Sequence, residues 1–349
     1  MVVASGFCAA AQPLESVRAL GSENAVERQK AIDTLRGLGE KSGDILRDIE
    51  KTEKLDWKPL ALLRKLVGES VIAAAQLPVL KVDDFAPLGG KKDEHAGGHS
   101  NVRLDAAKRT VLMPGKFIGM EDRPLEYLVV DNRERPDFRS RLHETLLCIE
   151  AAPSEVQTAL LMSLYGQSEV AADGSIVVGA DSGVMISVQF DFEMAHPNLA
   201  RESADSKAAA NPAVPHKTVR VPIESLVWNS QTEKFMRRAP FAITGSRLEK
   251  DPRSGKSIYM ADYAGWVVAL LLQAEQPYAL MYTPLDMRNT NPQSSNGFYR
   301  ACHYTAPPSG MPCTLVLEPY TGAAPKAADL VDTGNKGTGV APKPEASKP

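Results

Sequence analysis

The chain lacks the spacing patterns of the common metal, redox and membrane sites. Its 349 residues include four cysteines but no Cys-x-x-Cys pair, which excludes a zinc ribbon or a thioredoxin-like site. No apolar run reaches the ~20 residues that a spanning helix needs, so we expect no transmembrane segment. The net charge is −3 and no basic stripe is present. Nucleic acid is therefore not an expected partner.

Nucleotide and nucleophile motifs are also missing. Ser254-Gly255-Lys256-Ser257 looks like the end of a phosphate loop, but position 250 is Lys250 where that loop needs glycine. We interpret residues 251–256 as a hairpin turn. The stretch 179–183 does not fit the Gly-x-Ser-x-Gly elbow, and no dinucleotide fingerprint occurs. We therefore expect no cofactor.

Two of the cysteines are close together in the sequence. Cys302 and Cys313 flank Pro307-Pro308-Ser309-Gly310 and could close a small disulfide loop in an oxidising compartment. The alternative is that both are small buried apolar residues.

The N-terminus suggests export. The first 12 residues form a short apolar stretch with an Ala-x-Ala-like end, similar to the last part of a secretory signal peptide but without a basic region. Residues 1–13 are interpreted as a signal-peptide remnant, with a frayed terminus as the alternative.

Residues 14–77 have helical periodicity. Leu14, Val17 and Leu20 share one face, and a second pattern through Leu35 resembles one HEAT-type repeat. A single repeat cannot bury its own apolar face, because a stable solenoid needs about three. We expect this segment to dock on the rest of the protein or on a partner. Residues 78–100, rich in proline, glycine and charge, are predicted to be a linker.

From residue 101 the apolar period changes from 3.6 to 2. Many short strands and one clear helix, from Pro153 to Leu164, predict an α+β domain with a mostly antiparallel sheet over 101–319. The segment 195–216 is interpreted as a surface insertion. Residues 320–349, without periodicity, are predicted to be a disordered tail.

An ordered set of short motifs gives 101–319 a family resemblance. The motifs are Leu125-Glu126-Tyr127, His143-Glu144-Thr145-Leu146-Leu147, Ala159-Leu160-Leu161 with Gly166, Gly245-Ser246, Ala261-Asp262 with Gly265, and the run from Gly310 to Pro319. This region resembles the YdjY-type domain, a bacterial family found in many planctomycete proteins. It departs from the family pattern before Gly245, where a bulky aromatic is usual and Phe241 and Ile243 occupy the region. The resemblance implies an exported or envelope-associated protein and supplies no catalytic residues.

The pair His143-Glu144 is the main candidate for chemistry. Both residues fall on a predicted strand from 143 to 149, where neighbouring side chains point to opposite faces. One of them would then face the interior and need a partner. It would be either a general base or metal ligand, or a polar residue that fixes the register of the sheet.

Other candidate residues are more widely spread. Ser246 and Asp262 could join His143 in a Ser–His–Asp arrangement, or could be hydrogen-bonded turn residues. His95 and His99 are weak metal candidates, because Gly97-Gly98 between them argues against a helix.

Together these observations favour a non-enzymatic binding or interaction module that recognises an unknown protein or small molecule. It would be exported to the periplasm or cell envelope, with the cytoplasm as the alternative. The alternative function is a hydrolase or metal-dependent enzyme centred on His143 and Glu144.

Overall fold

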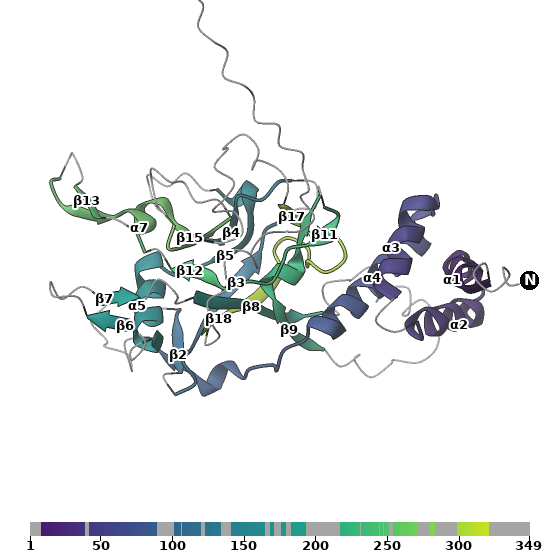
Figure 1. Ribbon diagram of the computed structural model, residues 1–349, viewed down its shortest axis with the longest axis horizontal. Coiled ribbons are helices and arrows are strands. Elements are labelled where there is room, and N and C mark those ends of the chain that lie inside the picture. Colours follow the sequence, from purple (N-terminus) through teal and green to yellow (C-terminus); the bar gives the residue numbers. More distant parts are fainter. Residues whose placement is uncertain are drawn as a thin grey trace, which may run out of the picture.

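The computed structural model of the protein describes residues 8–38, 42–88, 101–105, 107–119, 123–133, 141–164, 168–170, 176–178, 183–192, 217–230, 232–243, 245–246, 248–250, 254–270, 279–282 and 299–320. Helices come first in the chain, and a large, mostly antiparallel sheet with a helix follows (Figure 1). This is the α+β class that the sequence predicts.

Four helices form an N-terminal helical unit: α1 (Cys8–Ala19), α2 (Ala25–Arg36), α3 (Ser42–Thr52) and α4 (Trp57–Ala75). The first helix begins at Cys8, before the predicted residue 14 and within the proposed signal-peptide remnant. Asn24 caps α2 by accepting a hydrogen bond from the backbone N–H of Val26 at 2.9 Å. Val17, Leu35 and Leu63 pack together between the helices and are at most 1% exposed.

The rest of the chain forms one large sheet, three small sheets and five helical segments among the described residues. The strands of the large sheet are β1 (Ala86–Pro87), β2 (Arg103–Asp105), β3 (Thr110–Phe117), β4 (Tyr127–Asp131), β5 (Thr145–Ile149), β8 (Gly183–Asp191), β9 (Thr218–Pro222), β12 (Phe241–Ile243), β15 (Trp266–Ala269), β16 (Met281–Tyr282) and β18 (Pro312–Pro319). The small sheets contain β6 (Ser168–Val170), β7 (Ile176–Val178), β10 (Val227–Asn229), β11 (Lys234–Phe235), β13 (Leu248–Lys250), β14 (Ser257–Tyr259) and β17 (Tyr299–Ala301). The helical pieces are η2 (Val82–Asp84), η3 (Leu142–Glu144), α5 (Pro153–Leu164), η4 (Ile223–Leu226) and α7 (Met260–Ala264).

The large sheet closes into a ring, which we call the barrel. Its order is β3-β18-β8-β12-β16-β15-β4-β5, and β5 pairs back onto β3. The pairs β4–β5 and β15–β16 are parallel, while the other pairs in the ring are antiparallel. Gly115 lies where β5 meets β3, and a Cβ there would be 2.8 Å from the carbonyl oxygen of Cys148. Glycine therefore permits the close approach that closes the ring.

The barrel holds one continuous apolar core. Phe117 and Phe190 meet edge to face with their ring centroids 5.4 Å apart. Helix α5 adds Val156, Ala159 and Leu160, each at most 1% exposed, and packs against β2, β3, β15 and β18. The alternating strand pattern of the sequence is thus satisfied by a closed sheet with α5 against it.

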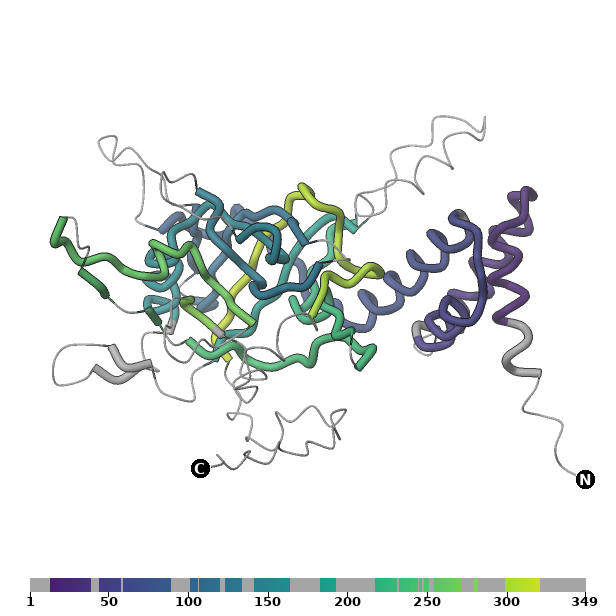
Figure 2. Tube along the Cα trace, turned by 90° about the horizontal axis from the view of Figure 1, so that it is seen from above, coloured from purple at the N-terminus to yellow at the C-terminus, as the bar shows by residue number. Residues whose placement is uncertain are grey.

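The helical unit contacts the barrel domain at a surface that we call the joint (Figures 1 and 2). Its apolar part combines the core of the four helices with Cys302 and Tyr304, and with Trp228 and Phe235 from the β10–β11–β17 sheet. At Gly68 in α4, a Cβ would lie 2.1 Å from the backbone oxygen of Tyr304. Only glycine therefore allows α4 to come this close to the 302–306 turn.

The first part of the predicted linker is packed on the barrel. The backbone N–H of Leu77 donates to the carbonyl of Arg220 at 2.7 Å, and Leu80 exchanges two hydrogen bonds with the side chain of Gln189. The Arg220 side chain, 3% exposed, donates to Ser187 in β8, to the Pro78 carbonyl and to Glu318 in β18. Residues 77–80 therefore lie beside β8 and β9, residues 86–87 pair with β2 as strand β1, and residues 89–100 lie outside the described residues.

The predicted strand from 143 to 149 needs correction. It begins only at Thr145, because residues 142–144 form the 3₁₀ turn η3. By contrast, the predicted helix from Pro153 to Leu164 is confirmed with both of its ends.

Candidate functional site

The structure separates the predicted polar residues into two groups. Strands β4 and β5 run parallel, with Tyr127 opposite Thr145. His143 and Glu144 precede β5, whereas Asp262 and Ser246 contact elements that follow it. The five-residue strand between the groups is roughly 16 Å long. A Ser–His–Asp arrangement of His143, Ser246 and Asp262 is therefore not formed.

The first group, the amino-end cluster, contains Glu126, Arg141, His143 and Glu144. The Nε2 atom of His143 lies 2.9 Å from Oε1 of Glu144, and a nitrogen of Arg141 lies 3.4 Å from Oε2 of the same carboxylate. The predicted arrangement on opposite strand faces is wrong, because η3 turns the two neighbouring side chains toward each other. The His143 side chain is 53% exposed, so it is not a buried register-fixing residue.

Sequence reasoning missed the acidic partner of this pair. Glu126 immediately precedes β4 as Glu144 precedes β5, and its backbone N–H donates to the Glu144 carbonyl at 2.9 Å. Partial burial and the neighbouring Glu144 carboxylate raise the pKa of Glu126, while Arg141 and His143 partly oppose this. The sequence did contain a signal for this contact. Glu126 and Glu144 each lie near the start of a predicted strand, and the two residues come together if these strands are parallel neighbours.

The second group, the carboxyl-end cluster, surrounds the N-terminus of α5. Asp262 accepts hydrogen bonds from the backbone N–H of Ser154 at 2.8 Å and from its hydroxyl at 2.6 Å. Glu155 accepts from the backbone N–H of Ala152 at 2.7 Å, as in a capping box. Arg133 binds the buried carboxylate of Asp131 through Nε and a terminal nitrogen at 3.0–3.1 Å. Each carboxylate here serves a helix cap or an ion pair.

Ser246 reaches the same helix through a tyrosine. Its backbone N–H donates to the Tyr259 hydroxyl at 3.1 Å, and that hydroxyl donates to the side-chain oxygen of Gln157 in α5. Burial raises the pKa of Tyr259 to about 12, and the charge of Asp262 acts in the same direction. Ser246 and Asp262 are therefore both linked to α5, Ser246 through Tyr259 and Asp262 directly. In the chain, Ser246 precedes the β13–β14 hairpin and Asp262 follows it. Asp262 therefore caps α5, and the backbone of Ser246 is held to the same helix through Tyr259.

These geometries give the two clusters different chemical capacities. The amino-end cluster combines two adjacent carboxyl groups with an exposed imidazole, so it can hold and exchange a proton. In the carboxyl-end cluster each carboxylate already has a partner, which is either the N-terminus of α5 or the guanidinium of Arg133.

The structure does not test the two metal candidates of the sequence. His95 and His99 lie outside the described residues. Among the residues that are described, no group of three His, Cys, Asp or Glu side chains is arranged to hold a metal ion.

Cys302 and Cys313 do not form the disulfide that their spacing allows. Both are buried free thiols, as is Cys148. Cys302 belongs to the core of the joint and Cys313 to the core of the barrel, so different structures surround them. Burial raises the pKa of Cys302 to about 11. The alternative reading, two small buried residues, is confirmed.

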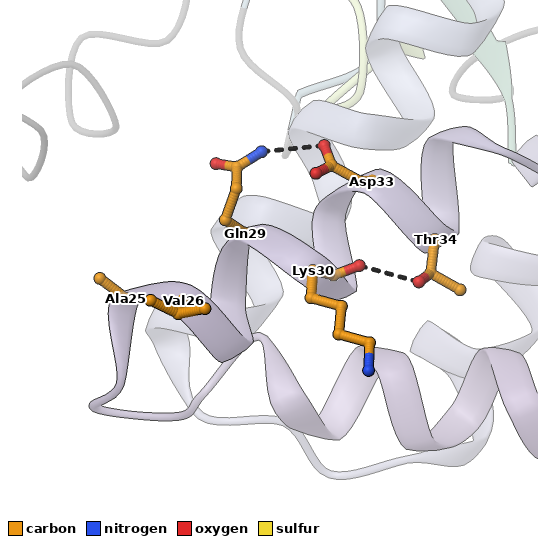
Figure 3. A pocket seen from close by; sticks show the side chains of 6 residues that line it. All are labelled: Ala25, Val26, Gln29, Lys30, Asp33 and Thr34. Carbon is orange, nitrogen blue, oxygen red and sulfur yellow. Dashed lines mark hydrogen bonds between the residues drawn. The ribbon is translucent and has the colours of Figure 1, made fainter.

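An open hollow lies on the outer face of α2 (Figure 3). Its volume is about 670 Å³, and the described residues that line it are Ala25, Val26, Gln29, Lys30, Asp33 and Thr34. Val26 is 76% exposed. Gln29 donates to Asp33 at 2.9 Å and the Thr34 hydroxyl donates to the Lys30 carbonyl at 2.8 Å, so the polar side chains of this face are held along the helix.

Comparisons with known proteins give no identification. No protein-family model matches the chain, and neither a curated protein nor a solved structure matches it. The resemblance to the YdjY-type domain therefore stays a prediction. In the described part of the chain, no helix has the length and apolar character to cross a membrane.

The amino-end cluster generates a pH prediction. Replacing Glu144 by Gln removes the neighbouring negative charge and should lower the pKa of Glu126 toward its ordinary value, because carboxylate repulsion helps to raise it. The change is measured by following the Glu126 side-chain carboxyl carbon by NMR as pH is varied. Asp262→Asn, at the other end of β5, is the matched control and should leave this titration unchanged. An unchanged Glu126 titration in Glu144→Gln would contradict the coupling.

Proposed function

We propose that the protein is a non-enzymatic interaction module in which the barrel carries the helical unit and the outer face of α2 binds a protein partner. The observation that carries the proposal is the hollow on α2, where an apolar side chain, Val26, is 76% exposed. Apolar surface rimmed by polar side chains, as Ala25 and Val26 are here by Gln29, Lys30 and Asp33, is a feature of interaction surfaces.

The way the helical unit docks supports this assignment. Helix α4 contacts β9 and η4, and Lys51 of α3 forms an ion pair with Glu233 beside β11. Helix α2 packs on α1 and α4 and leaves the face with Val26 outward. The lone HEAT-like segment thus docks on its own chain with one side, and the opposite side remains for a partner.

The chemistry of the hollow favours a protein over a small molecule. Small-molecule sites enclose their ligand and aim several polar groups inward. This hollow is open, and the described residues that line it all belong to α2, with Ala25 and Val26 next to Lys30 and Asp33. An apolar strip with one charge of each sign suits the amphipathic face of another helix, because each charge can meet its opposite.

The proposed setting is the periplasm or envelope of a bacterium, with the cytoplasm as the alternative. Two observations support export: the resemblance of residues 101–319 to the YdjY-type domain, and the apolar stretch with an Ala-x-Ala-like end in the first 12 residues. The partner remains to be identified by experiment.

Val26→Glu tests the interaction surface. A partner is first captured on the wild-type protein from an extract of cells that express it, then purified and titrated calorimetrically. We expect Val26→Glu to weaken binding at least ~10-fold, because a charge replaces the exposed apolar side chain of the hollow. The substitution lies in the first turn of α2, where a negative charge is compatible with the helix dipole.

The matched control is Met162→Glu, which places the same charge on another exposed apolar position, 53% exposed in α5. Its binding should equal that of the wild type. Equal binding by Val26→Glu and the wild type would place the partner elsewhere and reject the α2 surface.

One observation favours a second candidate, a hydrolase centred on the amino-end cluster. The raised pKa of Glu126 beside Glu144 and His143 resembles the paired acid and base groups of hydrolytic sites. This candidate requires turnover of an ester, phosphate or glycoside substrate that is lost in both Glu126→Gln and Glu144→Gln but retained in Asp262→Asn. Turnover that survives both glutamine substitutions, or no turnover at all on these substrates, removes it.

A further inference from the structure

The outer side of α2 carries a stripe of residues with the spacing of a helix–helix contact. Val26, Lys30, Asp33 and Gly37 follow one another at intervals of four, three and four positions, so they lie along one line of the helix. Gly37 directly follows the last residue of α2 and keeps helical backbone angles, with φ −63° and ψ −14°, so the stripe reaches it without a break. This spacing is that of the seam between two paired helices.

The stripe faces away from the rest of the helical unit. Helix α2 packs on α1 and α4 through its other side, where Ala31 and Leu35 are buried. All four residues of the stripe are exposed, and the hollow in Figure 3 lies along the same face. The stripe is therefore accessible to a partner.

The order of residues in the stripe makes it complementary to itself. Two copies of α2 can lie antiparallel around a two-fold axis that passes midway between residues 31 and 32. Residue 30 of one copy then faces residue 33 of the other, and residue 26 faces residue 37. Lys30 therefore meets Asp33 of the second copy twice, once on each side of the axis. The flanking Gln29 faces Thr34 in the same register.

The charges at the centre of the stripe favour this orientation over a parallel one. A parallel pair would place each Lys30 beside the other Lys30 and each Asp33 beside the other Asp33, and the like charges would repel. In the antiparallel pair both contacts are attractive. Gln29 donates to Oδ1 of Asp33 at 2.9 Å, which leaves Oδ2 for the ammonium group of the second copy.

The ends of the stripe fit the same register. Val26 of one copy lies over Gly37 of the other, and glycine has no side chain to hold the two helices apart at that point. The two-fold axis repeats this contact at the other end. One apolar contact therefore lies on each side of the central charges, as in an interface whose polar residues fix the register.

We propose that the partner of the α2 surface is a second copy of this chain, and that the two α2 helices pair antiparallel. This inference rests on the proposed function, because it names the occupant of the same surface. Helix α2 has 12 residues and is roughly 18 Å long, so the contact is small. We expect a weak dimer with a Kd on the order of 10–100 µM, because stable complexes bury a larger interface.

Sedimentation velocity of the full chain in low salt, at concentrations up to about 0.5 mM, tests the pairing. We expect the wild type to dimerise as its concentration rises. Lys30→Glu and Asp33→Lys should each weaken the dimer at least ~10-fold, because each places like charges opposite each other at two points. An equimolar mixture of these two variants should dimerise about as tightly as the wild type, since every charge of one variant then faces an opposite charge of the other.

Lys256→Glu is the matched control, because it reverses the charge of an exposed lysine next to β14 in the barrel domain. It should dimerise as the wild type does. A wild type that stays monomeric throughout, or a mixture that dimerises no better than its two components, would overturn the second copy as the partner. The α2 surface would then stand if Val26→Glu weakens the binding of a captured protein, and would fail as well if that binding is unchanged.

Discussion

The close approach of α4 to the 302–306 turn is the contact on which the arrangement of this protein depends. Gly68 allows it, because any Cβ at that position would collide with the Tyr304 carbonyl. Around this point the apolar core of the helices continues into Trp228 and Phe235, and Nε2 of His303 in the turn lies 3.9 Å from the carboxylate of Glu50 in α3. The helical unit and the barrel domain are therefore joined by one packed surface, and hydrogen bonds from Leu77 to Arg220 and between Leu80 and Gln189 attach the following chain to β9 and β8.

Much of the fold follows from local patterns in the sequence. Helix α5 is predicted with both ends, because the apolar period of residues 153–164 is a local signal that specifies it. The closure of the barrel by β5 onto β3 is not predictable in this way, since the pairing depends on contacts between distant segments. The 3₁₀ turn at 142–144 is missed for a related reason: its His143-Glu144 pair is held by side-chain contacts that no periodicity records.

The candidate site shows the same division. Sequence order suggested a single group of His143, Glu144, Ser246 and Asp262, but the parallel pairing of β4 and β5 separates them to opposite ends. It also brings Glu126 to Glu144, a partner that only the strand topology reveals. Capping and ion pairing explain the polar residues around α5. The adjacent carboxyl groups of Glu126 and Glu144 are the part of the candidate site with a perturbed pKa. The outward face of α2 then supports the assignment as an interaction module.

The unfolding free energy of Gly68→Ala, measured by urea titration, tests the central role of the joint most directly. We expect this variant to lose about 1–3 kcal/mol, because its methyl group would overlap the Tyr304 carbonyl. Gly21→Ala, where a Cβ would have ordinary contacts of 3.4 Å and longer, is the control and should change far less. An opposite result, in which Gly68→Ala gains the roughly 1 kcal/mol that alanine contributes in an unobstructed helix, would contradict the close approach of α4.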